Sequence, residues 1–215
     1  MDKSKSLLIG EEKFIFDCRR VIYWPRKKIL MAADLHWGKT QYLRSYGIAV
    51  SDAVLDADLE RLGHVLEDYD VKSFIVLGDL IHHEGALSPA IVSKIQNFRG
   101  KYPVELILVK GNHDRFTIFP PAWGIVEEAT LRIDQFLLVH DRKAREESYQ
   151  FCGHVHPMMR LQSSVDSLRL PSFMLLEKVC YLPAYSHLTG GRDMKLLKGE
   201  KALVLMPDGL ELFER

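Results

Sequence analysis

Short apolar runs separated by amphipathic segments set the pattern of the first half of the chain. The runs at 27–32, 73–79 and 104–114 predict strands, and the first of these strands leads to Asp34. Strands separated by helical patterns are typical of a sheet with parallel neighbours. This part of the sequence therefore predicts strand, loop and helix units in succession.

Two helices are predicted between these strands. Residues 51–68 repeat apolar residues at helical spacing, with Ser51 as the N-cap, and the following side chains share one face: Val54, Leu55, Leu62, Val65 and Leu66. Residues 88–100 predict a second helix, which begins after Ser88 and stops at Gly100.

The pattern becomes rich in strands after the third of these units. Five further apolar runs are bounded by turn residues, at 136–140, 149–154, 173–177, 179–183 and 202–206. They follow one another without long helical segments, which favours a second sheet of more antiparallel character. The whole pattern predicts an α/β sandwich.

Composition and charge limit the classes of function. The chain has 215 residues, of which 47% are apolar, and no linker or repeat divides it, so we expect a single domain over 1–215. Lys and Arg total 29 and so do Asp and Glu, so no global positive field draws the protein to nucleic acid or to an anionic membrane. Any anion binding must be local.

The cysteines and the N-terminal residues indicate the cellular compartment. Cys18, Cys152 and Cys180 lack paired spacing and are expected to be reduced, mostly buried thiols. The N-terminal apolar stretch is too short for a signal peptide, and no later run approaches the roughly 20 residues of a membrane span. We therefore expect a cytoplasmic protein that does not bind membranes.

Polar residues with metal-binding side chains gather at the ends of the predicted strands. The following seven lie at or just past these ends: Asp34, Asp79, Asn112, His113, His140, His154 and His156. In open α/β sheets this edge is where ligands bind. Carboxylate, imidazole and amide oxygen ligands suit manganese, iron or zinc and do not suit a thiolate site, and there are enough of them for two metals.

The same residues form an ordered series of motifs. These are "DLH" (Asp34 and His36), "GD" at 78–79, "GNHD" at 111–114, the isolated His140, and "GHVH" at 153–156. In type and order the series resembles the calcineurin-like metallophosphoesterases. The longer forms "ADLHWGK", "GDLIH", "GNHDR" and "GHVHPMMRL", with "LPAYSHLTGG" at 182–191, are most similar to the bacterial ligase-associated DNA damage response subfamily.

The resemblance implies a fold, a metal set and a reaction. The implied fold is a two-sheet sandwich flanked by helices (α/β/β/α). Asp34, His36 and His156 would hold one divalent ion, with manganese expected first and iron or zinc as alternatives. Asn112, His140 and His154 would hold the second ion, Asp79 would bridge the two, and His113 would be the catalytic acid.

One position departs from the wider family. Many metallophosphoesterases carry a second Asp three residues after the bridging one, where it orients the catalytic histidine. That position is His82 here, followed by His83. The sequence does not specify what orients His113 or whether either of these histidines contacts substrate.

Each of these residues also has a structural interpretation. A single Asp after a strand is commonly a turn or cap residue, and a single His is commonly a hydrogen-bonded structural one. We assign His64 and His187 to that class. Among the basic residues beside the motifs, Arg115 and Arg160 are the best candidates for contacting substrate phosphates.

Three functions are compatible with the sequence. The subfamily resemblance implies a DNA endonuclease in repair, acting on single-stranded or flexible DNA, with a DNA ligase and a helicase as partners. The alternatives are a phosphodiesterase or pyrophosphatase acting on a small nucleotide or metabolite, and a non-catalytic scaffold of the same fold. The oligomeric state does not follow from the sequence.

Overall fold

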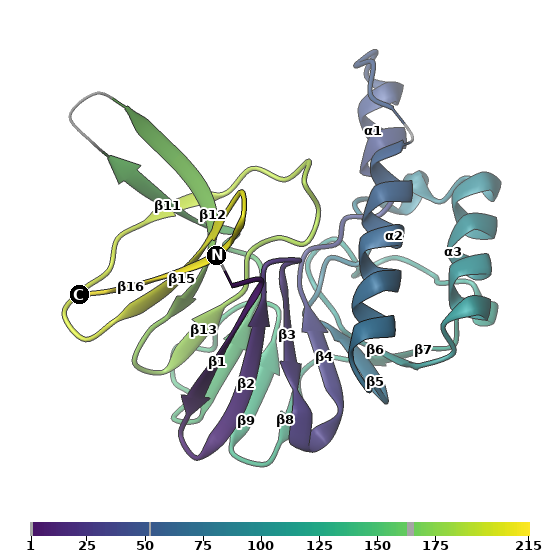
Figure 1. The fold of residues 1–215 in the computed structure, drawn as a ribbon. Helices are drawn as coiled ribbons and strands as arrows, with labels where there is room; N and C mark the ends of the chain where they lie inside the picture. The colour runs from purple at the N-terminus through teal and green to yellow at the C-terminus, as the bar shows by residue number, and fades with distance from the viewer. Residues whose placement is uncertain (1, 52, 163–165) are drawn as a thin grey trace.

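The computed structural model describes residues 2–51, 53–162 and 166–215, whose strands form two sheets (Figure 1). The first sheet has the order β1-β2-β3-β4-β5-β6-β7. Its strands are β1 (Ser4–Ile9), β2 (Glu12–Asp17), β3 (Val21–Trp24), β4 (Ile29–Ala32), β5 (Ser73–Val76), β6 (Glu105–Val109) and β7 (Ile125–Glu128).

The second sheet has the order β14-β11-β12-β13-β10-β9-β8, with β15 paired to β12 and β16 paired to β15. Its strands are β8 (Leu131–Ile133), β9 (Phe136–Val139), β10 (Tyr149–Cys152), β11 (Pro157–Gln162), β12 (Ser167–Leu175), β13 (Val179–Tyr181), β14 (Arg192–Met194), β15 (Lys201–Met206) and β16 (Gly209–Glu214).

Helices connect the parallel strands of the first sheet. Strands β1 to β4 pair antiparallel, whereas β4, β5, β6 and β7 pair parallel. A parallel connection needs a crossover, which α1 (Lys39–Ser45) and α2 (Ala53–Asp68) supply between β4 and β5, and α3 (Pro89–Lys101) between β5 and β6. Among the described residues there are also three short 3-10 helices, at Pro25–Lys27, Glu84–Ala86 and Pro121–Trp123. None of the helices in the described ranges is long and apolar enough to cross a membrane.

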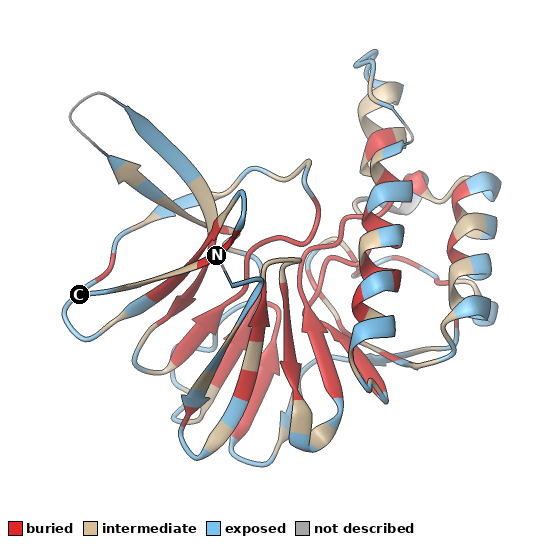
Figure 2. Cartoon of the chain, viewed as in Figure 1, coloured by how far each residue is buried: buried red, intermediate tan, exposed pale blue. Residues whose placement is uncertain are grey.

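Alternation along the central strands divides the core into two layers. In β4, Leu30 and Ala32 face the helices, whereas Met31 faces the second sheet, as expected for a strand buried on both faces. Aromatic side chains fill the layer between the sheets, where the Phe14 and Phe136 rings lie 5.3 Å apart and nearly perpendicular. Figure 2 shows the resulting buried strands between exposed outer surfaces.

The predicted α/β two-sheet sandwich is confirmed, with one difference in the helical layers. The three α-helices among the described residues lie on the side of the first sheet, on the right of Figure 1. On the outer face of the second sheet, side chains of its own strands pack against one another, including Met159 of β11, Met194 of β14 and Phe213 of β16. No helix among the described residues covers that face, because the second half of the chain has no amphipathic helical segment.

The predicted helix starts are confirmed, whereas one predicted helix end and several unpredicted elements differ. Ser51 and Ser88 accept backbone hydrogen bonds at the starts of α2 and α3, although Asp52 lies outside the described residues. Gly100 does not stop α3, which continues to Lys101. The sequence pattern did not predict the three N-terminal strands over 4–24, nor did it predict α1 or the strands β7, β8, β11, β14 and β16.

Candidate metal centre

The carboxyl ends of parallel strands from both sheets meet at one edge. Asp34 and His36 follow β4, and Asp79 follows β5. Asn112 comes after β6, and the second sheet adds His140 after β9, then His154 and His156 after β10. Since β9 and β10 are parallel to each other, their ends supply side chains at the same level.

At this edge, two groups of neighbouring side chains correspond to the ligand sets expected from the sequence. The ligand atoms of Asp34, His36 and His156 lie within 4.8 Å of one another, and so do those of Asp79, His140 and His154. In the second group, His140 Nε2 lies 3.0 Å from Asn112 Oδ1 and 3.1 Å from His154 Nδ1. The structure thus brings all seven predicted ligands to one place.

Asp79, a member of this second group, also lies close to His113. Its Oδ2 is 3.5 Å from His140 Nε2 and 3.9 Å from His113 Nε2, while Oδ1 accepts a hydrogen bond of 3.0 Å from the backbone N–H of His113. Burial raises the pKa of Asp79. A buried carboxylate among histidines is stabilised when cations share its oxygens.

The backbone at these residues is held in a costly conformation. Five of the predicted ligands have positive φ, from 47° to 65°: Asp34, His36, Asp79, His154 and His156. A positive φ in a non-glycine residue costs free energy and persists where the surrounding structure enforces it, commonly at functional sites. Because of these turns, two side chains that follow the same strand can approach one point, as Asp34 and His36 do after β4.

Two motif glycines are required by close packing against the ligands. A Cβ at Gly111 would lie 2.2 Å from Asp79 Oδ1, and one at Gly78 would lie 2.1 Å from His140 Nδ1. Either contact is shorter than real Cβ atoms show, so a side chain there would displace a ligand. This packing is the physical reason for glycine before Asp79 and before Asn112.

Asp114 is a supporting residue that sequence reasoning missed. Its fully buried carboxylate accepts hydrogen bonds from the backbone N–H groups of Asp79, Leu80 and Gly111, at 2.7, 3.1 and 2.9 Å. It therefore ties the β5 and β6 loops together below the ligands. Its place as the fourth residue of "GNHD" was the available signal.

The residues present fit divalent metal ions. Nε2 of His36 and Nε2 of His156 are buried and have no hydrogen-bond partner, although the latter lies 3.1 Å from Asp34 Oδ1. Burial, followed by the charge of Lys39, lowers the pKa of His36 to about 2, so its ring is neutral and keeps a nitrogen lone pair. Buried polar atoms without partners are rare in proteins, and a cation bound between these groups would satisfy both.

Backbone carbonyls orient two of the rings. His140 Nδ1 lies 2.9 Å from the Leu77 carbonyl oxygen, and His156 Nδ1 lies 3.1 Å from that of Gly190. Such contacts place the proton on Nδ1 and leave Nε2 for a cation, as in known metal sites. Gly190 belongs to the "TGG" tail, which lines the pocket over the ligands with Arg192 and Lys39.

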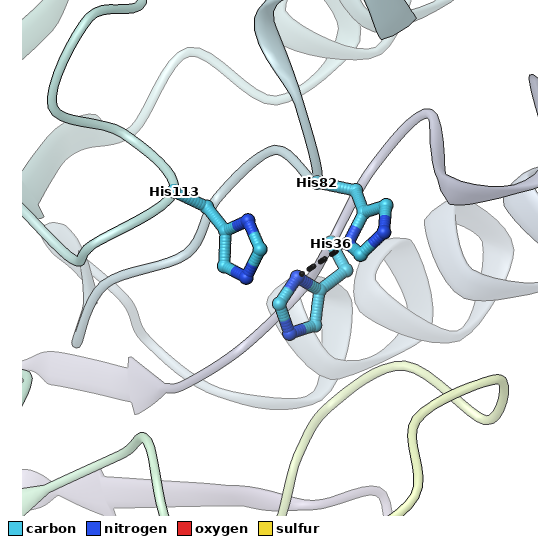
Figure 3. A group of neighbouring side chains, drawn as sticks. All are labelled: His36, His82 and His113. Carbon is cyan, nitrogen blue, oxygen red and sulfur yellow. Dashed lines mark hydrogen bonds between the residues drawn. The ribbon is translucent and has the colours of Figure 1, made fainter. Parts of the chain in front are cut away.

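His82 lies beside a predicted ligand, His36, and the predicted acid, His113, and the three ring centroids lie 5.1 to 5.2 Å from one another (Figure 3). Its Nδ1 is 3.4 Å from His36 Nδ1, and its ring stacks on that of His113 at 5.1 Å between centroids. Burial, followed by the charge of Lys39, lowers the pKa of His82 to about 4. The side chain in the position of the missing Asp is thus a neutral ring packed against His113.

The remaining candidates are divided between the site and other surfaces. Arg115 lines a cavity of about 430 Å³ that includes Asn112, His140 and His154. Arg160 lies outside the cavities that contain the predicted ligands, and its guanidinium pairs with Asp193 at 2.9 Å. His64 lies on the exposed face of α2, and His187 contacts Arg20, so both stay outside the candidate centre.

Comparison with known proteins identifies the family. The family model for the calcineurin-like phosphoesterases matches residues 27–167. The chain belongs to this family. It is therefore a metal-dependent hydrolase of phosphoester bonds, and the enzyme family expected from the motifs is confirmed.

A solved structure resembles this calcineurin-like phosphoesterase over nearly its whole length. The crystal structure of nuclease MPE from Pseudomonas putida matches with a TM-score of 0.83 and 29% sequence identity. The match covers 94% of this chain and 96% of that one. None of the curated proteins compared with the chain matches it.

Proposed function

We propose that this phosphoesterase is a two-metal nuclease that hydrolyses phosphodiester bonds in single-stranded or flexible DNA. The observation that carries the proposal is the similarity to nuclease MPE, at 29% identity over 94% of the chain. The ligand groups that meet beside Asp79 support the metal part of the proposal.

The ligands divide into two sets in this proposal. Asp34, His36 and His156 would hold one ion, Asn112, His140 and His154 would hold the other, and Asp79 would contribute to both. Two divalent ions, with manganese the first candidate, would supply a hydroxide near neutral pH and would neutralise phosphate charge. Asp114 and the Gly190 carbonyl keep the ligands in position through the contacts described above.

His113 is the proposed general acid. Its side chain is 35% exposed and lines the pocket over the ligands, so it reaches a bound phosphoester. Its ring stacks on His82, which limits its rotation. A proton given to the departing oxygen removes the negative charge that develops there, which accelerates cleavage of poorly acidic leaving groups.

The surroundings of the centre favour a diester within a longer chain. The pocket over the ligands and the Arg115 cavity share Asn112 and His154, and the cavity adds the cations Arg115 and Lys143. These cations lie where phosphates beside the scissile one would pass. A small nucleotide diester is the alternative substrate, and the zero net charge is the property that favours it.

Arg115→Ala is expected to weaken the binding of a DNA strand without loss of metal. Removing one phosphate contact should raise KM for an oligonucleotide about threefold to tenfold. It should also reduce the slope of log KM against log salt concentration by about 1, the share of one phosphate contact. Arg160→Ala is the matched control, because that guanidinium is held by Asp193 away from the centre. Equal effects of the two substitutions would remove Arg115 from the substrate path.

The substrate assignment is tested by offering the manganese-loaded enzyme four substrates side by side. These are circular single-stranded DNA, duplex DNA, a cyclic dinucleotide and a phosphomonoester. We expect cutting of the circle, which has no end and so requires an endonuclease, and loss of cutting after chelation. An intact circle together with rapid hydrolysis of the cyclic dinucleotide would replace the nuclease proposal by the small-diester alternative.

A role in DNA repair rests on the subfamily resemblance of the motifs. A DNA ligase and a helicase are the partners that this resemblance implies, and a cytoplasmic location stays a prediction from the sequence.

A further inference from the structure

An aromatic surface runs outward from the metal pocket along α1. Within it, the ring of His82 lies in the pocket wall, and the Tyr42 ring lies 4.8 Å from it between centroids. Tyr46 follows at 5.0 Å from Tyr42 and is 71% exposed, and the exposed His83 lies 5.5 Å from Tyr42. We call these four side chains the aromatic ladder: His82, His83, Tyr42 and Tyr46.

The ladder is continuous with a cation on the same helix. Lys39, Tyr42 and Tyr46 are spaced three and four residues apart, which places them along one face of α1 and its C-cap. Lys39 lines the metal pocket beside His82. One helix face thus carries a positive charge next to the scissile position and two tyrosine rings leading away from it.

From this arrangement we propose that the aromatic ladder stacks the unpaired bases of single-stranded DNA that lies across the metal pocket. The inference rests on the proposed nuclease function and names the surface that holds its substrate. A nucleotide combines an anionic phosphate with a flat base, and the helix face offers a cation and flat rings in the same order. Base stacking on aromatic side chains needs an exposed base face, which a paired duplex does not present.

The exposure of the aromatic ladder favours unpaired bases over other ligands. Tyr46 exposes its ring in the isolated chain, and stacking would remove that apolar surface from water. Because stacking accepts every base, the ladder adds affinity without sequence preference. It also explains how a chain of zero net charge binds a polyanion through few phosphate contacts.

The test compares two substrates of equal length and charge with the manganese-loaded enzyme. One is a thymidine 12-mer, and the other is a 12-mer in which every nucleotide lacks its base. We expect the KM of wild-type enzyme to be at least about tenfold lower for the thymidine strand. Tyr46→Ala and Tyr42→Ala should each reduce that ratio about threefold or more, whereas Tyr42→Phe should keep it.

Leu8→Ala is the matched control, since Leu8 is also 71% exposed but lies on β1, away from the centre. Tyr46 is fully outside the core, so Tyr46→Ala tests the ladder even if Tyr42→Ala disturbs α1. Equal KM values for both strands in wild-type enzyme, or an unchanged ratio in the Tyr46→Ala and Tyr42→Ala enzymes, would overturn the inference and leave the nuclease proposal standing. Failure of wild-type enzyme to cut either strand would instead count against the nuclease proposal.

Discussion

Asp79→Ala is expected to have the largest effect of any single substitution, with metal content below one ion per chain and activity at least about a thousandfold lower. Asp79 is the carboxylate proposed to be shared by both ions, so its loss affects each of them. A loss of several kcal/mol of charge stabilisation corresponds to about that factor in rate. Elemental analysis and hydrolysis of a nitrophenyl diester measure the two effects.

Asp79→Asn separates shape from charge in this experiment. The amide retains one oxygen ligand but lacks the negative charge, so we expect intermediate metal content. Asp56→Ala is the matched control, because Asp56 is an exposed α2 residue paired with Lys94. Full metal content in the Asp79→Ala enzyme would contradict the shared position of this carboxylate.

His113→Ala is expected to keep both ions and to lose about 10²- to 10⁴-fold in turnover on a natural dinucleotide, the usual contribution of a general acid. The metal should stay because Asp79 accepts its hydrogen bond from the backbone N–H of His113, which alanine preserves. A nitrophenyl diester, whose leaving group needs little protonation, should lose much less. The kcat values for the two substrates, measured beside metal content, check this.

His64→Ala serves as the control for histidine removal, since His64 is exposed on α2. Equal losses of turnover on both substrates would argue against proton donation by His113. Loss of an ion would make His113 a ligand.

The candidate ligands could be predicted from the sequence because their side-chain types suit metal binding and each follows a predicted strand. The structure brings Asp34, Asp79 and His140 together as that pattern implies, with His140 3.9 Å from Asp34 and 3.5 Å from Asp79. The predicted strands within 73–79 and 104–114 were found for a related reason, since strands buried on both faces are continuously apolar.

Features that depend on tertiary packing were not predictable in the same way. Asp114 differs from an ordinary turn residue only in its burial against the β5 and β6 loops. Tyr42 and His82 lie 40 residues apart in the sequence, and only the packing of α1 against the loop after β5 brings their rings together. Arg160 and Arg115 both flank a motif in the sequence, and only the folded structure shows that Arg160 pairs with Asp193.

Anomalous diffraction from crystals grown with manganese tests the central claim, the two-metal centre, most directly. The account predicts two peaks that share Asp79, one beside His36 and His156 and the other beside His140 and His154. A single peak, or peaks away from Asp79, would contradict it.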